Sequence, residues 1–182
     1  MGFESFVGRA LRSMRAGPEH LLSNTPGIKD APLTIKIGSP AFNDHSPIPS
    51  EYSADGGNQV PPIYWSRLPQ GTKEVILVME DMDPPFSGPR VHLIGFRISP
   101  SETQFSANSL RTGQLGYNSL GKCEYLGPKP LQSHGVHRYV FQIFALDKHM
   151  DWTTLPKKSI LKKILPGHVL ARGELTGTYE RT

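Results

Sequence analysis

The longest apolar run of this chain lies within residues 136–147, and few polar side chains interrupt it. A strand with one buried face alternates apolar and polar residues, whereas a strand covered on both faces is apolar nearly throughout. We therefore expect residues 136–147 to form the central strand of a sheet that is covered on both sides. Two shorter apolar segments, residues 74–80 and 91–99, are bounded by turn residues and predict further strands.

The remaining segments predict short strands, long loops and helices. Residues 33–37 alternate apolar and polar side chains, as a half-buried strand does. Residues 156–165 place isoleucines and leucines on one helical face and lysines on the other. Further strands are expected at residues 63–65 and 170–179, and mostly loop is expected at residues 39–62 and 100–130. These patterns predict a mainly β protein: a two-sheet antiparallel or mixed β-sandwich with peripheral helices.

Residues 3–15 predict an amphipathic helix, with an apolar face opposite Arg9, Arg12 and Arg15. Three interpretations are open: a helix docked on its own domain or on a second subunit, a helix that lies on a membrane surface, and a targeting presequence. Docking is favoured because the apolar face is only about three turns long. A docked helix would bury its apolar face and leave the arginines in solvent, and a homodimer is one outcome of such docking.

Length and composition indicate one domain over residues 33–182, preceded by a helix and an arm over residues 1–32. The formal charge of +4 is spread over separate stripes, and no nucleic-acid-binding module accompanies them, so no nucleic-acid partner is expected. The single cysteine, Cys123, allows no intramolecular disulfide and is assigned no chemistry. No secretory signal and no apolar stretch of about 18 residues is visible, so we expect a cytoplasmic protein without a transmembrane segment.

Polar residues stand at the ends of three of the predicted strands. Asp81 follows the apolar run of residues 75–79, His92 lies at the start of the next strand, and His137 lies at the start of the central strand. Such residues can converge at one end of a sheet, where their donors and acceptors suit a small anionic or phosphate-bearing ligand. Tyr139 lies two residues after His137, so both side chains leave the same face of the strand. If this face opens on the pocket, both residues serve the ligand; if it faces the core, Tyr139 is a packing residue and His137 a buried, hydrogen-bonded imidazole.

These residues belong to separated motifs that resemble the phosphatidylethanolamine-binding protein family, which includes Raf kinase inhibitor protein. The resemblance covers roughly residues 33–181 and rests on the motifs Glu80–Pro85, Val91–Leu93, Gly127–Pro130, Gly135–Phe141 and Gly167–Ala171. It implies a two-sheet β fold with one anion pocket at its edge. Carried over by position, the pocket would be lined by Asp81, His92, Gly127, Pro130, His137 and Tyr139.

The chain departs from the family pattern at two positions. Met82 and Leu131 stand where the family often has proline. The C-terminal helix of the animal members is not evident, so the chain resembles the shorter prokaryotic branch.

The leading hypothesis is a non-catalytic binding or regulatory protein that holds a phosphate-bearing small molecule or a phospholipid headgroup. The resemblance adds a protein kinase or a protease as an inhibited partner. In this interpretation His137 donates a charge-assisted hydrogen bond to the anion. The enzyme alternative is a hydrolase in which Asp81 orients His92 or His137 as a general base, although no nucleophile is obvious. A metal site of Asp81, His92 and His137 is the third class and is disfavoured, and no cofactor is expected.

Other polar residues near these motifs have simpler interpretations. Asp83 is expected to hold its loop, and Arg138 is expected to be a surface or ion-pairing residue. His45, His134 and His149 are interpreted as exposed turn residues.

Overall fold

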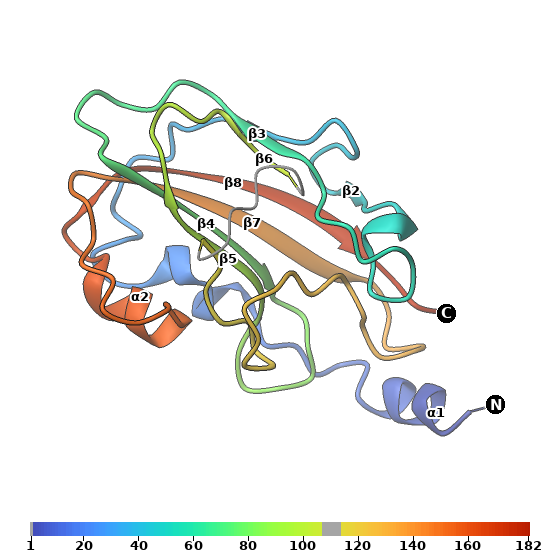
Figure 1. Ribbon diagram of the computed structural model, residues 1–182. Coiled ribbons are helices and arrows are strands. Elements are labelled where there is room, and N and C mark those ends of the chain that lie inside the picture. Colours follow the sequence, from blue (N-terminus) through green and yellow to red (C-terminus); the bar gives the residue numbers. More distant parts are fainter. Residues whose placement is uncertain (1, 107–113) are drawn as a thin grey trace.

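The computed structural model describes residues 2–106 and 114–182, and it confirms a mainly β protein with two sheets. The larger sheet has the strand order β2-β8-β7-β4-β5, and the smaller sheet, which lies across it in Figure 1, has the order β1-β3-β6. The strands are β1 (Ile37–Gly38), β2 (Ser46–Pro47), β3 (Ile63–Trp65), β4 (Glu74–Asp81), β5 (Arg90–Ile98), β6 (Gln104–Phe105), β7 (His137–Leu146) and β8 (Val169–Tyr179). The helices are α1 (Phe3–Ala10), α2 (Lys158–Ile164) and the short 3-10 turns Pro18–His20, Leu22–Asn24 and Ser50–Tyr52. All strand pairs are antiparallel except β2 with β8.

The central strands β4 and β7 are buried on both faces, as their apolar runs predict. Val75, Leu77 and Met79 of β4 point into the core between the two sheets. The alternate residues Ile76 and Val78 point to the opposite face, into a second apolar cluster. Because each face of β4 has its own core, the strand cannot alternate apolar and polar residues.

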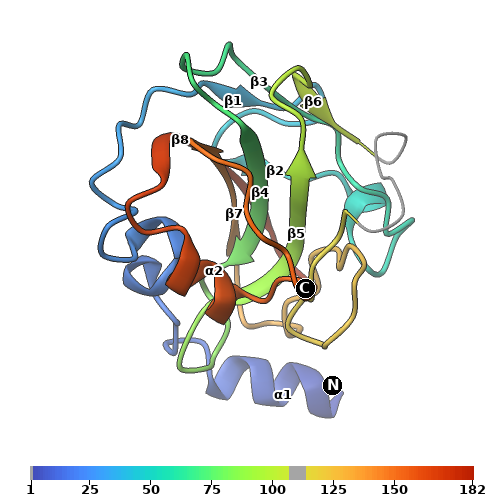
Figure 2. The same ribbon diagram turned by 60° about the vertical axis from the view of Figure 1, so that its left-hand side comes forward.

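The second face of the larger sheet is covered by α2 and by residues 18–31, the arm that follows α1 (Figure 2). Leu22 and Ile28 of the arm pack in the same cluster as Leu161 and Leu165, which lie within and just after α2. Buried Glu80 fixes this layer: its carboxylate accepts the Leu22 N–H and the Gln142 amide at 2.8 Å each and pairs with Lys158. The arm therefore completes a core face of the sheet.

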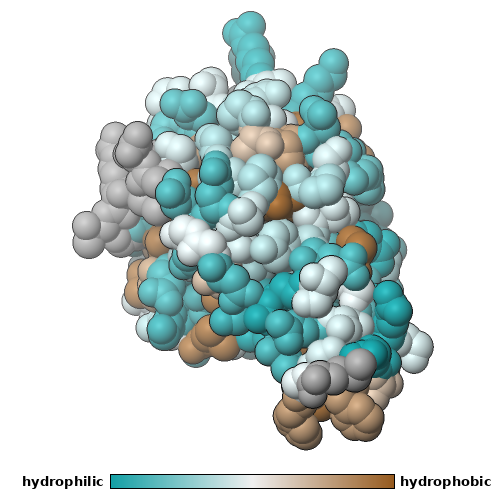
Figure 3. Space-filling model, turned by 90° about the vertical axis from the view of Figure 1, so that its right-hand side faces the viewer, coloured by the Kyte–Doolittle hydropathy of each residue, from teal (hydrophilic) through white to brown (hydrophobic). Residues whose placement is uncertain are grey.

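The orientation of α1 differs from the prediction. Its Phe3 and Phe6 side chains are 85% and 67% exposed. A hydrophobic, brown patch lies at the lower end of the molecule in Figure 3, where the chain begins. The face that contacts the domain is small and polar: buried Gly8 lies against Gln132, and Ser5 hydrogen-bonds Ser133 at 2.9 Å. The prediction that the apolar face docks on this domain is wrong, because the backbone contact at Gly8 turns that face outward.

Residues 33–37 form less strand than predicted, because they lie along an edge of β8 before entering the smaller sheet. Ile35 N donates to Arg172 O at 3.1 Å, and Leu33 forms an isolated parallel bridge with Arg172. The predicted loop over residues 100–130 contains β6, and residues 107–113 of it lie outside the described residues.

The outer edge of β5 is covered by the loop that follows the smaller sheet. Phe96 N donates to Gln114 O at 3.0 Å, and Gly116 N donates to Ile94 O at 2.9 Å. Ser119 N continues the contact with Val91 O at 2.9 Å. In the described part of the chain, no helix has the length and apolar character required to cross a membrane.

Candidate functional site

The predicted convergence of three strand ends is confirmed. Asp81 ends β4 and pairs in register with Arg90 at the start of β5 and with Tyr139 near the start of β7. A pocket of about 160 Å³ opens there, comparable to a cavity of about 150 Å³ that holds benzene. It is lined by Asp81, Pro84, Pro85, Phe86, Arg90, His92, Leu120, Leu126, Lys129, Pro130, Leu131 and His137. The site is thus large enough for a ligand of phosphate size.

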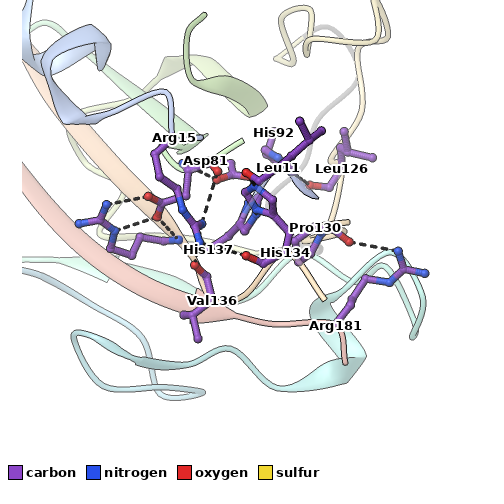
Figure 4. A network of polar contacts seen from close by, with 12 residues as sticks. Leu11, Arg15, Asp81, His92, Leu126, Pro130, His134, Val136, His137 and Arg181 are labelled. Atoms are coloured by element: carbon purple, nitrogen blue, oxygen red, sulfur yellow. Dashed lines mark hydrogen bonds and ion pairs between the residues drawn. The ribbon is translucent and has the colours of Figure 1, made fainter. Parts of the chain in front are cut away.

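A chain of hydrogen bonds runs from the pocket to the N-terminal helix (Figure 4). His137 Nδ1 lies 2.8 Å from Asp81 Oδ2, and His137 Nε2 lies 2.7 Å from His134 Nδ1. His134 Nε2 in turn lies 2.8 Å from Leu11 O, just after α1. Both ring nitrogens of His137 are therefore engaged, so His137 has no free N–H to give to an anion, contrary to the prediction.

The donors and acceptors in this chain of hydrogen bonds determine how many protons it needs. Its three bonds need three protons, because the carbonyl of Leu11 and a carboxylate only accept. Two neutral imidazole rings supply only two protons, so the three hydrogen bonds need one further proton. Burial lowers the pKa of His134, and His137 and Arg15 add to the effect.

His134 was interpreted from the sequence as an exposed turn residue, and that interpretation is wrong. Its side chain is fully buried beneath α1. The turn that places it has left-handed backbone at Ser133 and Gly135, with φ values of 61° and 101°. The only sequence signal was the pattern His134-Gly135-Val136-His137, in which a glycine between two histidines permits such a turn.

His92 is held by the backbone of residue Leu126. The His92 Nδ1 atom lies 2.6 Å from Leu126 O, and Leu126 N donates to His92 O at 2.9 Å. Because a carbonyl oxygen only accepts, Nδ1 carries the proton of the neutral ring. Burial lowers the pKa of His92 and outweighs the attraction of Asp81 for a proton. His92 Nε2 is then a buried acceptor, and it has no partner in the described part of the chain.

Tyr139 lies beneath the pocket, with its ring edge-on to His92 at a centroid distance of 5.2 Å. Burial, together with the nearby Asp81, holds the pKa of the Tyr139 hydroxyl well above its usual value, so the phenol stays protonated. Its Oη is buried and makes no hydrogen bond of ordinary geometry among the described residues, although the Asp81 carboxylate and the Lys129 backbone lie close enough to affect its pKa. Gly127 has a different place: its N–H donates to Asn58 Oδ1 at 2.8 Å, and it packs against residues 52–54. Pro130 lines the pocket, whereas Gly127 and Tyr139 lie behind its lining.

The loop after β4 is fixed by Asp83, in the role expected from the sequence. Its carboxylate accepts from the Arg138 N–H at 2.9 Å and from the Arg138 guanidinium at 2.6 and 2.8 Å. Burial opposes ionisation of Asp83, but these Arg138 bonds outweigh it and lower the pKa of that carboxyl. Arg138 is thus the expected ion-pairing residue.

Two cations lie at the pocket. Lys129 is paired with Asp55 at 3.1 Å, whereas Arg90 has no ion pair among the residues that the structure describes. Arg90 instead lies over the Phe86 ring, 5.9 Å from its centroid. Arg90 is therefore a cation at the pocket whose charge no carboxylate offsets among the described residues.

The alternative chemistries find less support in this geometry. Asp81 orients His137, but the remaining nitrogen of that ring is occupied by His134 and is not directed at a substrate. The described residues that line the pocket include no serine, threonine or cysteine that could serve as a nucleophile. Over the same described residues, no group of three histidine, cysteine or acidic side chains is arranged to hold a metal ion.

Comparison with known proteins places the chain. A family model described as phosphatidylethanolamine-binding protein matches residues 38–180. A UPF0098 protein of Methanothermobacter thermautotrophicus is 38% identical over 153 residues, which cover 81% of this chain and 99% of that protein. The solved structure of a phosphatidylethanolamine-binding protein homologue from Chlamydia trachomatis has a TM-score of 0.76 and 31% identity, over 82% of this chain and 99% of that one.

Escherichia coli YbcL, at 20% identity, shares the fold with a TM-score of 0.73 over 81% of this chain and 99% of that one. Fold and site together define a β-sandwich with a small pocket at its strand ends. The chain belongs to the phosphatidylethanolamine-binding protein family.

Proposed function

We propose that this chain is a non-catalytic binding protein whose pocket holds the phosphate group of a small molecule or headgroup. The observation that carries the proposal is the pair of buried atoms His92 Nε2 and Tyr139 Oη, which have no hydrogen-bond partner among the described residues. Buried polar atoms in proteins are almost always hydrogen-bonded. Leaving one without a partner costs about 1–3 kcal/mol, so a ligand that bonds both atoms gains affinity from them.

Charge and size support the same ligand class. Arg90 is a cation at the pocket with no ion pair among the described residues, and the protonated phenol of Tyr139 lies behind the pocket lining. The volume of about 160 Å³ suits a phosphate and its first substituent, with the remainder of a larger ligand left outside. The description of the matching family, phosphatidylethanolamine-binding, names a phosphate-bearing ligand as well.

The Tyr139→Phe variant tests this proposal, since it removes only the hydroxyl. We expect inorganic phosphate to bind about 5-fold to 30-fold more weakly by calorimetry, which is the loss of one hydrogen bond of about 1–2 kcal/mol. Tyr125→Phe is the matched control, because the Tyr125 hydroxyl donates to Tyr52 O at 2.8 Å and not to the pocket. Equal phosphate affinity in Tyr139→Phe and wild type would contradict the proposed ligand contact.

A further inference from the structure

The exposed large hydrophobic side chains of this protein gather at one end of the molecule. Nine are exposed in the described part of the chain, and three of them, Leu33, Tyr64 and Leu155, lie elsewhere. The other six belong to α1 and the turn after it, to the segment beneath α1, or to the rim of the pocket: Phe3, Phe6, Met14, Val136, Phe86 and Leu120. α1 lies beside the loop after β4, at the same end of the larger sheet (Figure 2). Apolar side chains that gather on a surface in this way mark an interaction site.

α1 is held with its polar side on the domain. Gly8 packs against the domain, and Glu4 accepts from the guanidinium of Arg181 at 2.5 Å. Phe3 and Phe6 lie one helical turn apart, so their side chains leave the same face, and both are exposed. The helix therefore presents a fixed pair of phenylalanines and needs no rearrangement to expose them.

The arginines of this segment have no carboxylate partners. Arg9 bonds a neighbouring serine of α1, and Arg15 bonds backbone carbonyl oxygens. Neither these two nor Arg12 forms an ion pair among the residues that the structure describes. Glu4, the one acidic residue of α1, is already paired with Arg181. This end of the molecule thus combines exposed aromatic side chains with positive charge that no nearby carboxylate offsets.

We infer that this end of the molecule docks on a lipid bilayer that carries anionic lipids, and that α1 makes the contact. Helices that lie on membranes combine phenylalanine or leucine on one face with arginine or lysine on another, and the apolar side chains enter the boundary between headgroups and acyl chains. Anionic headgroups attract the arginines. The family match begins at residue 38, so α1 adds this surface outside the matched region. The contact does not depend on a ligand in the pocket.

A second copy of the chain fits this face less well than a bilayer does. A two-fold axis places the same patch of both copies together, so the unpaired arginines of one copy would lie near those of the other. Stable protein interfaces also bury about 1,200 Å² or more. The large apolar side chains that α1 and the following turn expose are, among the described residues, only Phe3, Phe6 and Met14. An anionic bilayer complements the arginines and needs only a few apolar anchors.

Sedimentation of the full chain with vesicles tests the inference. Vesicles of phosphatidylcholine alone are compared with vesicles of phosphatidylcholine and phosphatidylglycerol in equal parts, at low and at high salt. We expect binding to the mixed vesicles at low salt, and weaker binding at high salt, where charges are screened. The double variant Phe3→Ala with Phe6→Ala should bind the mixed vesicles at least about tenfold more weakly. Leu33→Ala with Tyr64→Ala is the matched control and should bind like the wild type, because it removes two exposed apolar side chains that lie elsewhere.

A second pair of variants tests the contribution of charge. Arg9→Gln with Arg12→Gln removes two positive charges beside the phenylalanines, and we expect binding to the mixed vesicles to fall by about tenfold or more. Lys162→Gln with Lys163→Gln removes two exposed lysines of α2 and should lower it by less than about threefold. Equal losses in the two variants overturn the assignment of the contact to α1.

Calorimetry with inorganic phosphate separates this inference from the proposed function, because the phenylalanine variant leaves the pocket lining unchanged. Loss of vesicle binding with unchanged urea denaturation supports the inference. Vesicle binding by the phenylalanine variant that equals the wild type, or no binding of the wild type to mixed vesicles, overturns it and leaves the proposed phosphate site standing. A wild-type dimer in sedimentation equilibrium that the phenylalanine variant dissociates overturns it in favour of a second copy. Absence of phosphate binding by the wild type overturns the proposed function alone.

Discussion

Asp81 is the residue on which most of the polar contacts at the pocket depend. It anchors His137 and, through it, His134, and it also accepts from the backbone of its own loop. The three-bond chain of Asp81, His137, His134 and Leu11 needs one proton beyond those of two neutral rings, and Asp81 is its acidic member. The ligand pocket and the chain of hydrogen bonds therefore share a single charged group.

The variant Asp81→Asn removes that charge without changing the shape of the side chain. We expect a loss of unfolding free energy of about 1–3 kcal/mol, because one of the three hydrogen bonds is left without a proton. Urea denaturation near neutral pH measures the change. Asp151→Asn is a suitable control, since Asp151 is exposed and lies outside this network. An unchanged unfolding free energy in Asp81→Asn would argue against the additional proton.

Asp83 predicts a defined acid sensitivity. Its pKa is lowered in the folded protein, so its contribution to stability is fully present above the unfolded value of about 3.9 and is lost as pH falls through the folded value. We expect Asp83→Asn to cost about 1.5–3 kcal/mol at neutral pH and progressively less below about pH 4. Paired urea titrations of wild type and variant across this range measure the difference. A cost that stays constant down to about pH 2 would assign the effect to packing instead of charge.

The residues of the site could be predicted only in part. The sequence places Asp81, His92 and His137 at strand ends, because strand boundaries follow from the limits of the apolar runs. It does not reveal the partner of each ring: the Leu126 carbonyl that fixes His92 is 34 positions away in the sequence. The role of His134 depends on left-handed backbone at Ser133, where the residue type gives little indication.

At the level of elements, the end of β4 both contributes to the pocket and attaches the arm and α2 to the larger sheet. Asp81 faces the pocket, and its neighbour Glu80 faces the arm and α2. The predicted strands 74–80, 91–99 and 136–147 are confirmed because each is a nearly continuous apolar run, and the predicted helix 156–165 is confirmed because its apolar residues repeat with the helical period. The orientation of α1 was not predictable in this way, because its contacts with residues 132–136 are between distant parts of the sequence.

The variant Glu80→Gln tests the attachment of the arm and α2 to β4. We expect a loss of about 3–5 kcal/mol, since the substitution leaves the partly buried Lys158 without its carboxylate. Chemical denaturation measures the loss. The exposed pair of Lys122 with Glu124 gives the control, and Glu124→Gln should cost less than about 1 kcal/mol. Similar costs in both variants would show that burial does not strengthen the Glu80 pair.

Gly8 tests the docking of α1. A Cβ atom at this position would lie 1.9 Å from Gln132 O, so Gly8→Ala should release the helix although alanine favours helix over glycine by about 1 kcal/mol. Faster cleavage by trypsin at Arg9 and Arg12 would report the release. Gly2→Ala is the control, because a Cβ there meets nothing within 4 Å. Unchanged cleavage of the Gly8 variant would contradict the close backbone contact.

At the level of the whole molecule, the covered faces of the larger sheet contribute much to the free energy of unfolding, and the exposed face of α1 contributes little. Phe144 of β7 is fully buried in the second apolar cluster, whereas Phe3 and Phe6 bury little within this chain. The pocket lies at one end of the sheet, so ligand contact and core packing are largely separate. Changes on the exposed face of α1 should therefore leave the fold intact.

The double variant Phe3→Ala with Phe6→Ala should change the unfolding free energy by no more than about 0.5 kcal/mol, whereas Phe144→Ala should cost about 3–5 kcal/mol. Urea denaturation at several protein concentrations, with sedimentation on the same samples, measures both. A concentration-dependent loss of stability in the double variant would show that a second copy of the chain covers this face.

The covered edge of β5 has a consequence for the behaviour of the protein in concentrated solution. A long exposed edge strand offers a template on which other chains add strands and aggregate. Here the Gln114–Ser119 segment already occupies backbone positions along β5, and the opposite edge of the larger sheet is the two-residue strand β2. Loss of the contacts of that segment would open the β5 edge even if the core stayed folded. Substitutions that release the Gln114–Ser119 segment should therefore cause fibril formation before they lower the free energy of unfolding.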